Sequence, residues 1–214
     1  MLNGLPAPWT VRYVFYRWRD EGLDQTICGL LRCRVRERAG RIEDPGLVVL
    51  DARSVRAADN VPAATTGKDA AERVPGRRHG IAVDIIGLII AVVVVAASVH
   101  DNQVGAAMSS KVAAPTSSVR TALVDQGFKS TVVDHGTEPG IDLQTVERNP
   151  ESGFTPQPIR WRVEQTYGTL ILQRRLTRDY EGSPRTAESR LYWAASTITM
   201  RRLTGAAAPS WRGV

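Results

Sequence analysis

The sequence has few cysteines and few histidines, and each shortage argues against a class of site. Its two cysteines, Cys28 and Cys33, lie five residues apart with no second Cys or His pair near them. This spacing supports neither a zinc site nor a disulfide framework, so we expect a reducing, cytoplasmic setting. The histidines, His79, His100 and His135, are scattered along the chain. A metal site or a nucleophilic centre built on histidine is therefore not expected.

Long hydrophobic runs are also scarce, and the one that could be mistaken for a membrane span, Ile85 to Val99, is short. Its fifteen residues fall below the roughly 20 that a spanning helix needs, and Asp84 and His100 bound it. Its valines and isoleucines, with Gly87 near the start, favour buried strands. The first fifteen residues contain no basic region followed by an apolar one, so neither secretion nor a membrane partner is expected.

Lysine is rare as well, which leaves the positive charge almost entirely to arginine. Lys and Arg together number 28 against 22 acidic residues, giving a net charge of +6, and the only lysines are Lys68, Lys111 and Lys129. This balance favours a polyanionic partner such as nucleic acid. A proteome in which all proteins are rich in arginine would produce the same charge. The length of 214 residues fits one domain, or one domain with a small helical appendage, with enough chain to bury a core.

From Trp9 to about Gly40 the pattern is helical and strongly basic. Two helices joined around Gly22 to Asp24 are the simplest interpretation. Aromatic and arginine side chains are interleaved along them: Trp9, Arg12, Tyr13, Tyr16, Arg17, Trp18, Arg19, Arg32, Arg34, Arg36, Arg38 and Arg41. A basic aromatic pair of helices could track phosphates. A packed helical hairpin with a solvated arginine face would show the same pattern.

From Leu47 onward the spacing of hydrophobic residues changes from a helical pattern to one typical of strands. The run from Leu47 to Leu50 predicts a buried strand that ends at Asp51. Residues Arg56 to Pro75 have no clear period and are expected to form a loop. Two further strands, His79 to Val83 and Leu88 to Ala96, are predicted as antiparallel neighbours of the first.

The second half of the chain alternates between helix and strand patterns. A helix is expected from Asn102 to about Ala114, where Pro115 stops it. "VRTALVDQGF" predicts a strand that runs into Asp125, and "IDLQTVERNP" predicts a fifth strand. Two helical patterns follow, Arg160 to Arg175 and Ala187 to Arg202. This order predicts an α/β fold with a central sheet and helices packed on it.

Glu164 is an isolated acid in the basic stretch "RWRVEQTYG". Stepping about 100° per residue, the polar arc of this helix holds Arg162, Gln165, Thr166, Thr169 and Gln173. Glu164 falls between Ile171 and Gly168 in the opposite, apolar arc, which predicts that it points toward the sheet.

An inward carboxylate requires compensation by a cation. An ion pair with Arg160 or Arg175 on the same helix would provide it. A bound metal is the other interpretation, because Asp51 and Asp125 also end apolar strands, and three inward acids can share divalent ions.

Taken together, these segments resemble a bacterial insertion-sequence transposase of the DDE class, whose catalytic domain has the ribonuclease H-like fold. The resemblance covers about Pro8 to Leu203. It is carried by "PWTVRYVFYRWRDEG", "VVLDARSV", "PGRRHGIAVDIIGLIIAVVV", "ALVDQGF", "RWRVEQTYG", "RRLTRDYEGSP" and "LYWAASTITMRRL". Each of these is weak alone, and their order and spacing make the signal specific. The implied fold is a ribonuclease H-like mixed sheet flanked by helices, with a short N-terminal basic helical segment.

The resemblance implies a catalytic triad of Asp51, Asp125 and Glu164 that binds Mg²⁺, with Mn²⁺ as a substitute. The implied activity is cleavage and strand transfer of double-stranded DNA at insertion-sequence ends and target, with room for a homodimer in the DNA complex. Candidate DNA contacts are Arg77, Arg78 and His79 in the "GRRH" turn, together with Arg160 and Arg162.

Members of this class usually begin with a further helical DNA-binding region, whereas this chain starts almost at "PWTV". We therefore expect a shortened copy with a basic helical remnant (1–43), a catalytic domain (44–205) and a tail (206–214). The alternative function is a catalytically silent remnant that binds DNA non-specifically through its arginine-rich helices.

Overall fold

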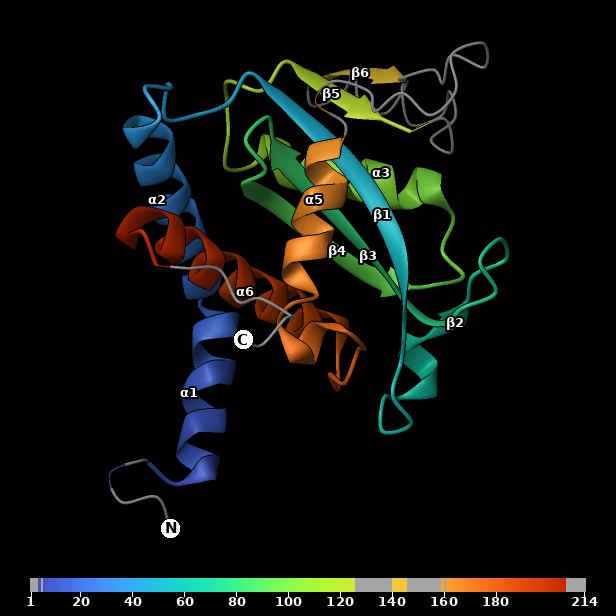
Figure 1. Ribbon diagram of the computed structural model, residues 1–214. Coiled ribbons are helices and arrows are strands. Elements are labelled where there is room, and N and C mark those ends of the chain that lie inside the picture. Colours follow the sequence, from blue (N-terminus) through green and yellow to red (C-terminus); the bar gives the residue numbers. More distant parts are fainter. Residues whose placement is uncertain (1–3, 5, 126–139, 146–158, 160, 207–214) are drawn as a thin grey trace, which may run out of the picture.

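A computed structural model describes residues 4, 6–125, 140–145, 159 and 161–206 of the chain. Within them, six strands form one sheet that carries helices on both faces (Figure 1). The strands are β1 (Leu47–Arg56), β2 (Gly67–Lys68), β3 (Pro75–Asp84), β4 (Ile89–Ala96), β5 (Thr121–Val124) and β6 (Asp142–Thr145). The helices are α1 (Pro8–Asp20), α2 (Leu23–Arg38), α3 (Asp101–Ala113), α5 (Trp161–Leu170) and α6 (Pro184–Thr204), with 3₁₀ turns at Ala63–Thr65 and Arg174–Leu176.

The sheet is mixed, with an antiparallel half and a parallel half. β3 pairs antiparallel with β1 from Val48↔Asp84 to Arg56↔Gly76, and β4 pairs antiparallel with the other edge of β3. The prediction that both strands are antiparallel neighbours of the first is therefore confirmed for β3 and wrong for β4, which pairs with β3 instead. β5 pairs parallel with β1, and β6 pairs parallel with β5. A crossover through α3 separates β4 from β5, as parallel pairing requires.

Two hydrophobic clusters fill the space on either side of the sheet. On one face Val48, Leu50 and Ala82 pack with Val104 and Met108 of α3. On the other face, Val49, Ile81 and Val83 pack with residues of α2, α5 and α6: Cys28, Val163, Tyr167, Leu170, Ala187, Leu191, Tyr192 and Ala195. Successive residues of β1 therefore alternate between the α3 face and the α5 face.

Two predicted boundaries were wrong. β1 does not end at Asp51 but continues to Arg56, because β3 pairs with it along that whole length. The helix that carries Glu164 ends at Leu170 rather than Arg175, because the chain tightens there into 3₁₀ geometry. The prediction of a loop from Arg56 to Pro75 was also wrong in part, because this stretch contains the 3₁₀ turn and strand β2, which pairs with β3 at Gly67↔Gly76. The described parts of the other elements agree with their predicted ranges to within about four residues.

The apolar run from Ile85 to Val99, which is too short for a membrane span, contains β4, a buried strand at the edge of the sheet. Its outward backbone groups are satisfied by side chains: Val92 N–H donates to the Tyr192 hydroxyl (3.0 Å) and Val94 N–H to Glu188 Oε1 (2.9 Å). The Lys111 ammonium donates to Val92 O (2.9 Å). Among the described helices, none combines the length and the apolar character that crossing a membrane demands.

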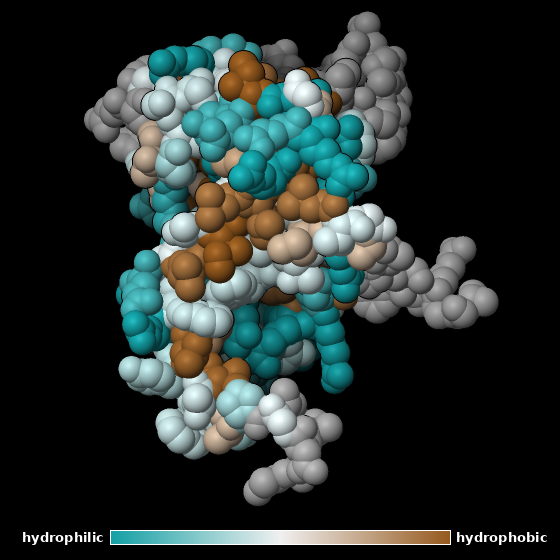
Figure 2. Space-filling view, turned by 90° about the vertical axis from the view of Figure 1, so that its left-hand side faces the viewer, coloured by the Kyte–Doolittle hydropathy of each residue, from teal (hydrophilic) through white to brown (hydrophobic). Residues whose placement is uncertain are grey.

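The two N-terminal helices are joined at Gly22, as predicted, and Gly22 has a positive φ of 71°. In Figure 1 α2 continues along the same side of the molecule beyond the end of α1, so the two helices do not form a packed hairpin. α2 packs on α6 and buries Arg36, which forms an ion pair with buried Asp84. α1 buries none of its residues, and Trp9 remains 74% exposed. On this side of the molecule hydrophobic patches alternate with polar ones (Figure 2).

Candidate functional site

Asp51 lies in β1 on the face of the sheet that α5 covers. Its neighbour Leu50 packs toward α3 and Val49 packs toward α5, so strand alternation directs Asp51 to the α5 face. The side chain is half-buried. Pairing of β1 with β5 is last seen at Val49↔Leu123, which places Asp51 two residues beyond the end of the parallel ladder.

Asp125 directly follows the neighbouring strand, β5, which ends at Val124. It follows Leu123 by two residues, as Asp51 follows Val49, and it is also half-buried. Val124 packs toward α3 and Leu123 toward α5, so Asp125 also belongs to the α5 face. Neighbouring strands lie about 4.8 Å apart. Continuing the β1–β5 register by two residues beyond its last pair sets Asp125 opposite Asp51, and their sharing of one site stays a prediction.

Helix α5 lies across the sheet at β1 (Figure 1), and the buried side chain of Tyr167 holds it there. The Tyr167 hydroxyl donates to His79 O at 2.5 Å and lies 3.1 Å from Asp51 O. Burial raises the pKa of Tyr167 well above its usual range, and the charge of Asp51 acts in the same direction. The phenol therefore keeps its proton at neutral pH and remains a hydrogen-bond donor.

Glu164 does not point toward the sheet as predicted, because its side chain is exposed. The buried face of α5 is Val163, Thr166, Tyr167 and Leu170. Thr166 was predicted to face solvent because it is polar, but it is buried. Its hydroxyl hydrogen is shared between Gly87 O (3.1 Å) and Arg162 O (2.9 Å). The buried face of α5 is therefore rotated relative to the predicted one. Glu164 lies at the margin of this buried face, one turn before Tyr167.

The described residues contain no group of three or more His, Cys, Asp or Glu side chains placed to hold a metal ion. Asp51 and Asp125 are adjacent by register, whereas Glu164 stands on α5 above the same face. The predicted alternative, an ion pair with Arg175, is not formed, since Arg175 pairs with Glu181 at 2.8 Å. Arg160 lies outside the described residues.

The expected phosphate contact of Arg77 does not fit its surroundings. Arg77 has no exposed surface, and its guanidinium lies 3.2 Å from the Asp179 carboxylate. It also donates to Glu181 O at 2.9 Å and to Thr65 O at 3.1 Å. Arg77 thus ties the segment before α6 to the sheet, which is a structural role.

Arg78 and His79 require the same correction. Arg78 faces away from Arg77 and forms ion pairs with Asp69 and Asp101. His79 is 4% exposed, and its Nε2 lies 3.3 Å from Asp179 Oδ2. Arg77 and His79 are buried beside Asp179, and Arg78, which is only partly buried, is paired with two other carboxylates, so each basic side chain of the "GRRH" stretch already has an acidic partner.

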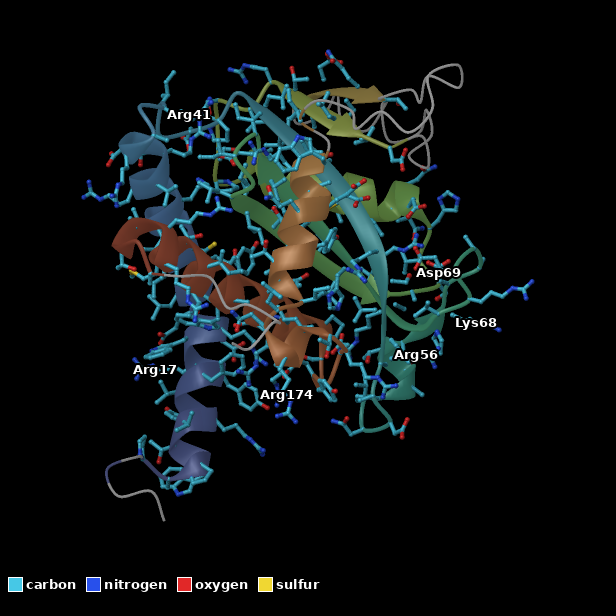
Figure 3. The ribbon with its side chains drawn as sticks, in the orientation of Figure 1. Arg17, Arg41, Arg56, Lys68, Asp69 and Arg174 are labelled. Atoms are coloured by element: carbon cyan, nitrogen blue, oxygen red, sulfur yellow. The ribbon has the colours of Figure 1, made fainter. Side chains whose placement is uncertain are left out.

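Asp69 collects several donors where the loop after β2 folds back on the sheet; Figure 3 shows it beside Lys68. The Ser54 hydroxyl donates to it at 2.5 Å, the N–H groups of Ala71 and Glu72 at 2.8 and 2.9 Å, and Arg78 forms an ion pair with it. Burial by itself would raise the pKa of Asp69. These donors outweigh burial and hold the pKa well below its usual range.

We predict acid-sensitive folding from these carboxylates. The pKa of Asp179 is also lowered, since the bonds from His79, Glu181 N–H and Arg77 outweigh the effect of burial. A carboxyl whose folded pKa is depressed contributes stability above its unfolded pKa of about 3.9, and this is lost as pH falls further. Urea unfolding followed by circular dichroism should show a constant unfolding free energy down to about pH 5 and a steep fall below about pH 4.

The matched control for this prediction is exposed Asp59. Asp69→Asn should lower stability at pH 7 and flatten the fall at acid pH, whereas Asp59→Asn should do neither. Equal pH slopes in the two variants and the unsubstituted chain would show that Asp69 does not supply the acid sensitivity.

Sequence reasoning missed two residues of this face. Arg53 follows Asp51 by two positions, is exposed, and its guanidinium lies 5.6 Å from the Tyr167 ring. The spacing in "DARSV" was the available signal, because residues i and i+2 of a strand share a face. Tyr167 was assigned only to the apolar arc. Of the predicted basic contacts, Arg162 is partly exposed and its guanidinium stacks on the Trp161 ring at 3.9 Å.

The mixed sheet, with two parallel strands delivering acids to one face and helices on both sides, defines an α/β domain of the ribonuclease H-like type. The family model for the transposase DDE domain matches residues 42–200, and the chain belongs to this family. The matched span contains Asp51, Asp125 and Glu164. No curated protein matches the sequence.

Proposed function

We propose that this transposase-family chain cuts and joins DNA by metal-dependent phosphoryl transfer at Asp51, Asp125 and Glu164. The observation that carries the proposal is that Asp51 in β1 and Asp125 just after β5 each lie two residues beyond Val49↔Leu123, the last pair of the parallel ladder. Membership of the transposase family implies DNA as the substrate.

The donor set fits a hard divalent cation. Two carboxylates on neighbouring strands repel each other, and a cation between them offsets this repulsion. Carboxylate oxygens are the ligands that Mg²⁺ prefers, and Mn²⁺ accepts the same donors. When bound there, the metal would lower the pKa of the attacking hydroxyl and neutralise charge on the leaving oxygen.

The three acids would divide the task by position. Asp51 and Asp125 are set by the sheet, which makes them the rigid part of the site. Glu164 is exposed on α5, one turn from the Tyr167 anchor, and would complete the ligand set from the side open to DNA.

Two reactions would use this site in succession. Water attacks a phosphorus at the end of the element, and the bond from that phosphorus to the 3′-oxygen breaks, leaving a 3′-hydroxyl. That hydroxyl then attacks a target phosphorus and displaces the 3′-oxygen of the target strand. We propose that exposed Arg53 and partly exposed Arg162 contact the phosphates flanking the reacting one.

The test is incubation of the purified chain with a short duplex carrying its own element's end, with and without Mg²⁺ or Mn²⁺. Metal-dependent nicking that Asp125→Ala abolishes would support the proposal. Salt-sensitive binding without any nicking would support the second candidate function, non-specific DNA binding through arginine by a catalytically silent chain.

The arginine contacts give a separate prediction. Arg53→Ala and Arg162→Ala should each weaken duplex binding and reduce the slope of log K against log salt by about 1. Arg41→Ala is the control, since Figure 3 shows Arg41 beyond the end of α2, away from α5. Fluorescence anisotropy at several salt concentrations measures the slopes, and equal slopes for Arg41→Ala and Arg53→Ala would remove Arg53 from the interface.

A further inference from the structure

Tyr167 connects the helix that carries Glu164 to the strand that carries Asp51. The side chain is buried on α5, and its hydroxyl lies between backbone carbonyls of two neighbouring strands, His79 O of β3 and Asp51 O of β1. One of these carbonyls belongs to a candidate metal ligand. The contact therefore occurs at the residue whose position matters most for the site.

The geometry of α5 extends this contact to Glu164. Residues three apart lie on the same side of a helix, about 4.5 Å apart along its axis. Glu164 precedes Tyr167 by three residues, so the tyrosine fixes how far along β1 the glutamate stands. Thr166 makes the second described contact, to Gly87 O in the β3–β4 turn, and this contact lies away from Asp51.

We propose that Tyr167 is a positioning residue that holds Glu164 at a fixed distance from Asp51, an inference that rests on the proposed function. Its hydroxyl has one hydrogen, which is shared between His79 O at 2.5 Å and Asp51 O at 3.1 Å. Removing the hydroxyl leaves the ring packed against Leu170 and Leu191 but frees α5 to shift along the sheet.

The chain contains a matched control in Tyr192. This tyrosine is also buried and packed in the same hydrophobic cluster, and its hydroxyl accepts a hydrogen bond from a sheet N–H, that of Val92. Its partner lies on β4, two strands from Asp51 with Ile81 of β3 between them. Tyr167→Phe and Tyr192→Phe therefore each remove one buried phenol hydroxyl with a backbone partner, and only the first should disturb the acids.

The test measures Mn²⁺ binding by calorimetry in the unsubstituted full chain and in both variants, with thermal unfolding and duplex affinity measured beside it. Tyr167→Phe should bind Mn²⁺ about three- to tenfold more weakly, the effect of one hydrogen bond. It should also need more Mg²⁺ for half-maximal nicking, with duplex affinity unchanged. Tyr192→Phe should lose similar thermal stability and keep its Mn²⁺ affinity.

The outcomes separate this inference from the function it rests on. Equal Mn²⁺ affinities in Tyr167→Phe and Tyr192→Phe, with Mn²⁺ binding lost in Asp125→Ala, would overturn the positioning role alone. No Mn²⁺ binding by the unsubstituted chain would overturn both. A selective loss in Tyr167→Phe at unchanged duplex affinity supports the positioning role, because a merely structural contribution would affect both tyrosine variants alike.

Discussion

Replacing Asp51 or Asp125 with asparagine is expected to lower metal-dependent nicking by about a thousandfold, or about 4 kcal/mol of transition-state stabilisation. Asparagine keeps the size of the side chain but removes the charge that attracts the cation. If the β1–β5 register continues past its last pair, Asp51 and Asp125 form one carboxylate pair, and each variant removes half of it. The double variant should therefore be about as active as the less active of the two single variants, because the effects of substituting residues that act as a unit do not add.

Thermal unfolding gives a readout of the same substitutions that does not depend on activity. A ligand that binds only the folded chain stabilises it by about 2.7 kcal/mol at 100 times its dissociation constant. For a chain of 214 residues this corresponds to a rise of roughly 5–10 °C in Tm. Mg²⁺ or Mn²⁺ should produce this rise in the unsubstituted chain, and EDTA should reverse it.

The contrast with a variant outside the site decides the interpretation. Asp51→Asn and Asp125→Asn should lose the metal-induced rise in Tm, whereas Asp59→Asn, at an exposed position, should retain it. If the aspartate variants kept both the rise and the nicking, the metal would be bound elsewhere on the chain.

The sheet and the two aspartates could be predicted from sequence because the same pattern, an apolar run with an acid at or near its end, marks both the strands and the aspartates. Apolar runs of Val, Ile and Leu marked β1, β3 and β4, and an acid that interrupts or ends such a run is conspicuous. Asp51 and Asp125 stood out in this way. Their adjacency required the parallel register between β1 and β5, which the sequence does not encode locally.

The orientation of Glu164 could not be predicted because polarity is a poor guide to burial for threonine. Thr166 lies inside the fold with its hydroxyl bonded to two carbonyls, and this moves the buried arc of α5. The position of Tyr167 depended on tertiary contacts in the same way. Its partners, Asp51 O and His79 O, lie 116 and 88 residues away in the chain.

The fate of the "GRRH" stretch had the same cause. Two consecutive arginines normally indicate a solvent-exposed segment, but the acid that pairs with buried Arg77 lies in a distant segment. Asp179 is 102 residues from Arg77, and no local pattern connects the two. Sequence reasoning consequently assigned Arg77 to DNA, and the structure assigns it to the interior.

Truncating this interior arginine should destabilise the fold more than any surface substitution discussed above. Arg77→Ala is expected to lower the unfolding free energy by about 3–5 kcal/mol, because it leaves the Asp179 carboxylate buried without its cation. The corresponding fall in Tm is roughly 10 °C for a chain of this size. Chemical unfolding and differential scanning calorimetry measure both quantities.

Arg56→Ala provides the comparison, since Arg56 is an exposed strand arginine on the neighbouring strand, paired with Gly76 beside Arg77. It removes the same charge and should cost less than about 0.5 kcal/mol. A double variant, Arg77→Ala with Asp179→Ala, should recover part of the loss, because the uncompensated carboxylate is then absent. If Arg77→Ala instead left Tm unchanged and reduced the salt dependence of duplex binding, Arg77 would belong to the DNA interface. A guanidinium with no exposed surface can reach a phosphate only if the segment before α6 first separates from the sheet, and that opening would itself lower Tm.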